Sequence, residues 1–104
     1  MRGRIDAATL LERAIVGQAA AAGAPITVSA ATATRWASAT FVGARHRLTI
    51  DGPHGAATDA WLAGLAEADL PIRGHLVADL VVLGSAHADG RFTATVEVLT
   101  LREG

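Results

Sequence analysis

The apolar residues at the start of the chain recur at helical spacing. Leu11, Ile15 and Ala19 stand at every fourth position between more polar residues, so they fall on one stripe of an amphipathic helix. Asp6 precedes the stripe and is a favourable N-cap residue, while a glycine and a proline follow its end. This pattern predicts a helix over residues 6–22.

A second helical stretch, over residues 56–69, repeats the first. Each stretch is followed by a similar tripeptide, Ala24-Pro25-Ile26 or Leu70-Pro71-Ile72. Proline cannot continue a helix and disfavours helical geometry at the residue before it, so we expect the chain to leave each helix in an extended conformation. The repeat also predicts equivalent buried faces, and we expect five helical residues in the core: Leu11, Ile15, Trp61, Leu62 and Leu65.

Apolar and polar residues alternate after each tripeptide, as they do in β-strands. The first alternating region is broken by a turn near Trp36 that contains no glycine. Asp89-Gly90 divides the second region and is a strong hairpin signal. The four predicted strands span residues 26–34, 39–50, 75–85 and 92–101.

The resulting order, αββαββ, predicts an α+β fold in which a single domain, residues 1–104, forms a two-layer α/β sandwich. Short hairpins pair neighbouring strands, so we expect a four-stranded, mainly antiparallel sheet with both helices on one face. This topology resembles a circularly permuted ferredoxin-like fold whose first strand has moved to the end. The resemblance implies that the second and fourth strands lie side by side and parallel at the centre, with the first and third at the edges. Ferredoxin-like folds have many unrelated functions, so the topology predicts no activity.

The composition narrows the classes of function. The formal net charge of −1 argues against the extended basic surface of most nucleic-acid-binding proteins and against a polybasic membrane anchor. The chain contains no cysteine, which excludes disulfides, thiolate metal sites and cysteine nucleophiles and fits a reducing compartment. No apolar run approaches the length of a membrane-spanning helix. We therefore expect a cytoplasmic protein.

The four histidines do not have the spacing of a metal site. No His-x-His or His-x-x-x-His pair occurs among His46, His54, His75 and His87. Asp79 follows His75 by four positions, but residues so spaced on a strand lie about 13 Å apart, too far to share one ion. We therefore predict no metal site and no cofactor.

Two further motifs have simple structural interpretations. The loop Gly52-Pro53-His54-Gly55 precedes a helix N-terminus, which can receive an anion, but it lacks the lysine and the glycine spacing of a phosphate-binding loop. Ser85, His87 and Asp79 have the residue types of a catalytic triad, but they lead into a hairpin rather than a nucleophile elbow. We expect a plain turn at the first motif and no catalytic residue at the second.

The predicted second strand has two different faces. His46 alternates with apolar residues of that strand, so we expect it to be partly buried and to have a backbone hydrogen-bond partner. Arg45 and Arg47 lie on the opposite face. Acidic residues of neighbouring strands, Glu97 and Asp79, can pair with these arginines across the sheet.

Apolar residues on the sheet face away from the helices predict association. The third strand supplies Val77, Val81 and Leu83, and the fourth supplies Leu99 and Leu101. Both faces of an antiparallel sheet are rarely so apolar in a monomer. The leading hypothesis is therefore a small binding or assembly module that forms a homodimer through this face. The expected interface residues are Phe41, Val81, Leu83, Glu97 and Leu99.

Two alternative functions stay open at this point. The first is a small enzyme whose pocket forms at the dimer interface and holds an acidic small molecule. The side chains that would hold this ligand are Arg45, His46, Arg47 and His75. The second is a nucleic-acid-binding sheet, because Arg45 and Arg47 beside Phe41 resemble the aromatic and basic surface of single-strand binders. The net charge makes nucleic acid a weaker expectation than a second copy of the chain or another protein.

Overall fold

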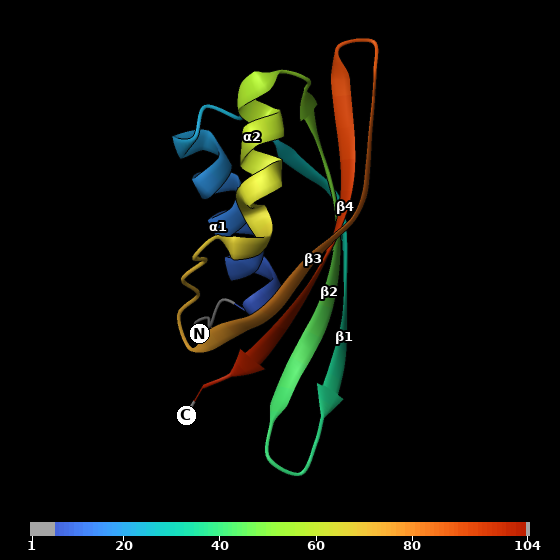
Figure 1. Cartoon of the computed structure of the whole chain (residues 1–104). Helices are drawn as coiled ribbons and strands as arrows, with labels where there is room; N and C mark the ends of the chain where they lie inside the picture. The colour runs from blue at the N-terminus through green and yellow to red at the C-terminus, as the bar shows by residue number, and fades with distance from the viewer. Residues whose placement is uncertain (1–5, 104) are drawn as a thin grey trace.

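The computed structural model describes residues 6–103 and contains two helices and four strands in the predicted αββαββ order (Figure 1). Both helices lie on one face of the sheet. The α+β fold and the four-stranded antiparallel sheet are therefore confirmed. The helices are α1 (Ala7–Ala21) and α2 (Ala56–Gly64), and α2 continues into a short 3₁₀ turn, η1 (Leu65–Glu67). The strands are β1 (Thr27–Ala37), β2 (Val42–Pro53), β3 (His75–Ala88) and β4 (Arg91–Arg102).

The strand order is β1-β2-β4-β3, and every neighbouring pair is antiparallel. The central and edge positions agree with the prediction, but the prediction that the second and fourth strands run parallel is wrong. The connections explain the difference. α2 returns the chain to the end of the sheet where β2 began, so β3 runs in the same direction as β2 (Figure 1). The hairpin after β3 then reverses the chain, and β4 lies between β2 and β3, antiparallel to both.

The turn between β1 and β2 lies later in the chain than predicted. The Ser38 amide donates to the Phe41 carbonyl oxygen at 2.8 Å, and the Ser38 hydroxyl accepts from the Phe41 amide at 3.1 Å. Arg35 and Trp36 therefore belong to β1 rather than to the turn. A serine side chain stabilises this turn, so no glycine marks its position in the sequence.

β1 is exposed on both faces along most of its length. The β1–β2 hairpin extends beyond the two helices (Figure 1). Ala31 and Ala33, which pair with the buried Leu48 and His46 and so face the helix side, are exposed for this reason. The only strand paired with β1 in the described part of the chain is β2.

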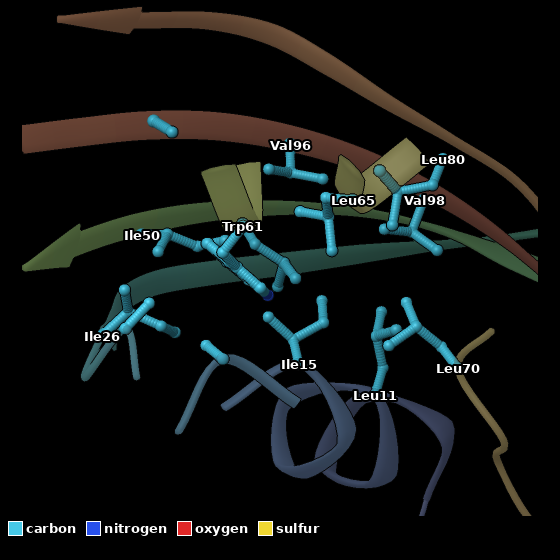
Figure 2. Packing of buried hydrophobic residues seen from close by; sticks show 14 of the residues in the cluster. Leu11, Ile15, Ile26, Ile50, Trp61, Leu65, Leu70, Leu80, Val96 and Val98 are labelled. Carbon is cyan, nitrogen blue, oxygen red and sulfur yellow. The ribbon is translucent and has the colours of Figure 1, made fainter. Parts of the chain in front are cut away.

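The hydrophobic core fills the space between the helices and the sheet (Figure 2). Ile15 and Trp61, which occupy equivalent positions in the sequence repeat, are both buried. The indole Nε1 of Trp61 donates to Oε1 of Gln18 at 3.1 Å, so α2 and α1 are also joined by a polar contact. Leu62 is only partly buried, contrary to the prediction, because it borders a groove between α2 and β3. The core includes Leu11, Ile15, Ala19, Leu48, Ile50, Trp61, Leu65, Val96 and Val98.

The two tripeptides after the helices anchor the chain in this core. In the first, the Ala24 amide donates to the Ala19 carbonyl oxygen at 2.8 Å, in the manner of a Schellman cap. Gly52 of β2 lies against this turn, since a Cβ on Gly52 would be 2.9 Å from the Pro25 carbonyl oxygen. The prolines are exposed, whereas the apolar residues on either side of them are buried: Ala24, Ile26, Leu70 and Ile72.

β3 has two irregularities in its pairing with β4. The first follows Val77 and inserts one residue into the strand, which shifts the alternation of faces. Val77 therefore pairs with Thr100 and packs against the core, instead of lying on the outer face as predicted. Asp79 and Val81 remain on the outer face, opposite Leu99 and Glu97 of β4.

Candidate functional site

The four residues predicted to hold a ligand lie on opposite faces of the sheet. Arg45 and Arg47 are exposed on the outer face, away from the helices, whereas His46 is buried between the sheet and the helices. His75 pairs with Arg102 at the start of β3 and borders a pocket on the helix side. Successive residues of a strand point to opposite faces, so these four side chains do not form one site.

The outer face carries charged side chains at its centre. Nη2 of Arg47 donates to Oε2 of Glu97 on β4 at 3.0 Å, which confirms the cross-strand pairing predicted for these two residues. In the next row of side chains on this face, Arg45 of β2 pairs with Leu99 of β4, and Leu99 pairs in turn with Asp79 of β3. Adjacent strands are about 4.8 Å apart, so Leu99 separates Arg45 from Asp79. No ion pair joins Arg45 to Asp79 within residues 6–103.

Apolar side chains surround these charges. Leu76 and Val81 of β3 pair with Leu101 and Glu97 on this face and are 50% and 43% exposed. Leu83, a predicted interface residue, is 47% exposed but is the unpaired residue at the second irregularity of β3. On β4, Leu99 and Leu101 are half-buried. An antiparallel sheet with one face in water normally presents polar residues there, so this face is more apolar than a solvated face usually is.

The aromatic residues of the β1–β2 hairpin are placed differently from one another. Phe41, a predicted interface residue, is 52% exposed in the turn at the hairpin tip and does not lie on the sheet face. Trp36 lies on β1 opposite Gly43, and its Nε1 is buried without a hydrogen-bond partner among residues 6–103. Gly43 lets β2 approach β4 closely, because a Cβ on Gly43 would collide with the carbonyl oxygen of Thr100.

A second candidate site is a pocket of about 340 Å³ on the helix side of the sheet. It lies between the N-terminus of α1 and the end of the sheet where β2 begins and β4 ends. Arg35 and Arg102 form no ion pair with any other residue in the range 6–103. The polar residues that line the pocket are Asp6, Arg35, His75, Thr100 and Arg102.

His46 is 1% exposed and contacts one of these lining residues. Its Nε2 is hydrogen-bonded to the hydroxyl of Thr100 at 2.9 Å, and its Nδ1 has no partner within the described residues. The partner of His46 is therefore a side chain and not the backbone group that was predicted. The same Thr100 hydroxyl also donates to the carbonyl oxygen of Ala44 at 3.4 Å.

We expect the free energy of unfolding to fall as the pH is lowered through the histidine range. Burial lowers the pKa of His46 below its ordinary value of 6.5, nearby His75 lowers it further, and Asp6 opposes the shift. Above pH 6.5 the imidazole is mostly neutral in both the folded and the unfolded chain. Below pH 6.5 the unfolded chain binds the proton first, so stability is lost toward the lower pKa of the folded state. Denaturant titrations between about pH 7.5 and pH 5 measure this slope.

The variant His46→Gln should reduce this slope, because it removes the titrating group but keeps a side chain able to bond Thr100. His87→Gln, at an exposed histidine, is the matched control and should keep the slope. A wild-type slope in the His46 variant would show that another group is responsible. The pKa of Asp6 is lowered by a hydrogen bond from the Thr9 amide, so Asp6 titrates below this pH window.

The remaining histidines form no metal site in the structure. The rings of His54 and His87 stack with centroids 4.0 Å apart, and Nε2 of His54 lies 3.4 Å from a carboxylate oxygen of Asp59. Among residues 6–103, no group of three or more histidine, aspartate or glutamate side chains could hold a metal ion. The amide of His54 donates to the carbonyl oxygen of Gly90 at 2.9 Å, which ties the turn after β2 to the β3–β4 hairpin. Gly52 and Pro53 were predicted to belong to a loop, but they are the last residues of β2 and pair with Phe92 and Arg91.

Comparisons of the chain with protein-family models, with curated proteins and with solved structures found no match. Within the described residues, no helix combines the length and the apolar character needed to cross a membrane.

Sequence reasoning missed most of the residues that line the pocket. The sequence pattern predicts that Arg35 lies in a turn, and it does not single out Thr100 or Arg102. These three residues come together only when β1, β2 and β4 pair. One signal for the pocket is present in β2. On the face of β2 toward the helices, the side chains become smaller from Leu48 to Ala44. The small Ala44 leaves space beneath the N-terminus of α1.

Proposed function

We propose that the protein is a small homodimeric binding or assembly module whose subunits pack through the outer faces of their sheets. The exposed apolar surface on β3 and β4 carries this proposal, because burying apolar surface contributes about 25 cal/mol per Å². The side chains that would be buried are Leu76, Val81, Leu99 and Leu101. Since the chain has no cysteine, we place the dimer in the reducing cytoplasm.

The distribution of charge favours a second copy of the chain as the partner. The outer face has positive side chains on β2 and negative ones on β4 and β3, so it is complementary to itself across a two-fold axis. A two-fold axis that runs parallel to β2 and β4, midway between them, brings Arg47 opposite the partner's Glu97. By the same symmetry, Glu97 lies opposite the partner's Arg47. The same operation sets Trp36 against the partner's Leu76. Side chains of like charge do not face each other in this arrangement.

Known modes of sheet packing agree with this geometry. Two sheets that pack face to face keep their strands within about 30° of each other, so neighbouring rows of the two faces stay in contact near the axis. In such an interface the charge pairs fix the register more than they add affinity. The apolar side chains would provide most of the affinity, and a stable contact of this kind buries at least about 1,000 Å².

Light scattering at micromolar concentration tests the proposal directly. The expected mass is about twice the chain mass of 10.6 kDa. A mass near that of one chain would remove the main support for the proposal. A crystal in which the outer face is bare, or buries less than about 1,000 Å² in every contact, would contradict it as well.

We also infer that the fold is a circular permutation of the ferredoxin-like arrangement. The strand order with β2 and β4 at the centre, and both helices on one face, support this inference. Asp6 and Ala7 at the start of α1 border the same pocket as Arg102 at the end of β4, so the two ends of the described chain lie close together. Joining these ends would give the unpermuted order βαββαβ.

The two alternative functions have less support. The pocket that includes His75 lies on the helix side of the sheet, away from the proposed interface, which disfavours an active site between subunits. On the outer face, Arg47 already pairs with Glu97, and Phe41 lies outside the face. Both observations weaken the case for a nucleic-acid-binding sheet.

A further inference from the structure

Two arginines that have no part in the proposed dimer interface, Arg35 and Arg102, line the pocket on the helix side of the sheet. We propose that this pocket binds a small oxyanion, a carboxylate or a phosphate group, through Arg35 and Arg102. The inference goes beyond the proposed dimer and does not depend on it, because the pocket lies on the opposite side of the sheet from the outer face.

Strand register brings the two arginines to the same end of the sheet. Arg35 pairs with Ala44, and Ala44 pairs with Thr100 on β4. Arg102 is two residues beyond Thr100 on the same face of β4 and pairs with His75. Only β2 separates the strands of the two arginines, and Arg102 is offset by two residues along β4, so their backbones lie about 12 Å apart, within reach of one ligand for two long side chains. Ala44 between them is small and leaves the pocket open.

The charges that line the pocket favour an anion. Arginine stays protonated at every physiological pH, and its planar guanidinium donates two parallel hydrogen bonds to a carboxylate or a phosphate. Arg35 and Arg102 have no ion-pair partner in the range 6–103 that would compete with such a ligand. Asp6 is the opposing charge, but its Oδ1 already accepts the Thr9 amide at 2.9 Å as the N-cap of α1. The lining therefore stays net positive.

Other groups complete the lining. The Thr100 hydroxyl is held in place by its 2.9 Å hydrogen bond to the buried His46. Nδ1 of His75 donates to the carbonyl oxygen of Arg73 at 3.2 Å, which holds the ring at the edge of the pocket. The volume of about 340 Å³ lies at the lower end of the range for small-molecule sites. A small anion therefore fits better than a polymer.

Titrations with inorganic phosphate and, separately, with succinate test this proposal at constant ionic strength. Calorimetry gives the affinity, and the amide NMR shifts of Ala44 and Thr100 report the location. Arg35→Gln and Arg102→Gln should each weaken binding at least about tenfold, which corresponds to about 1.4 kcal/mol. Arg13→Gln removes the same charge from an exposed position on α1 and should keep the wild-type affinity.

The two ligands distinguish the two kinds of anion. Saturable binding of phosphate alone identifies a phosphate site, binding of succinate alone identifies a carboxylate site, and either result supports the proposal. The proposal is overturned if neither anion binds more tightly than about 10 mM. It is also overturned if Arg13→Gln weakens binding as much as Arg35→Gln does. Arg35 is exposed on an edge strand, so its variant is expected to fold.

Discussion

Replacing Trp61 by alanine is expected to lower the free energy of unfolding by about 3–5 kcal/mol. Trp61 is 6% exposed and points from α2 into the core (Figure 2). The change removes buried apolar surface, leaves a cavity, and takes from Gln18 the hydrogen bond that joins the two helices. Small domains are stable by only about 5–15 kcal/mol, so this loss is a large part of the total.

Denaturant titration of both proteins at the same concentration measures this difference. Phe41→Ala is the matched control, because it removes another aromatic ring from a position in the hairpin turn that is 52% exposed. The control is expected to lose less than about 1 kcal/mol. A Trp61 variant no less stable than the control would show that the tryptophan does not support the core.

Changing Arg47 to glutamate is expected to raise the dissociation constant of the proposed dimer about 100-fold. The substitution would surround the proposed two-fold axis with carboxylates, because the proposed arrangement also brings Glu97 of both subunits there. Within one chain, the side chains of the Arg47–Glu97 pair are 59% and 31% exposed, and surface pairs contribute only about 0.2–1 kcal/mol, so the fold should persist. Sedimentation velocity over a concentration series measures the dissociation constant, and thermal unfolding checks the fold.

The double variant Arg47→Glu with Glu97→Arg restores opposite charges across the proposed interface. We expect it to recover the wild-type dissociation constant to within about tenfold. Arg13→Glu makes the same reversal on the exposed side of α1 and should leave the dimer intact. If the single Arg47 variant stays dimeric, or the double variant does not recover, the two-fold arrangement is wrong.

The helices and the second hairpin could be predicted because their signals are local. Asp6 accepts the Thr9 amide as the expected N-cap of α1. Asp89 and Gly90 have φ values of 55° and 76°, as a tight two-residue turn between strands requires. The sequence repeat also predicted equivalent burial, which Ile15 of α1 and its counterpart in α2 confirm.

Side chains and irregular pairing explain the local predictions that were wrong. The Ser38 hydroxyl closes the first hairpin, and serine is too common to mark one turn position. The extra residue after Val77 changes which face of β3 meets the core, and an alternating pattern does not show where such an insertion occurs. The direction of β4 relative to β2, by contrast, follows from the order of crossover and hairpin alone.

The candidate pocket could not be predicted because its residues are distant in the sequence. Arg35 and Arg102 are far apart in the sequence, and only the pairing of both β1 and β4 with β2 brings them to one pocket. The placement of His46 on the opposite face from Arg45 and Arg47, by contrast, could be predicted from the sequence. It follows from the alternation of a single strand and needs no knowledge of the other strands.

Gly43 and Gly52 offer a way to recognise homologues of this chain. At each position a side chain would strike backbone atoms, the carbonyl of Thr100 in one case and that of Pro25 in the other. Backbone atoms cannot move aside without displacing a strand, so a chain that keeps this fold should keep both glycines while its alanine-rich surfaces vary. Together with the two tripeptides that end in Pro-Ile, these glycines form a short signature. A search confined to these positions can detect homologues whose remaining residues have diverged.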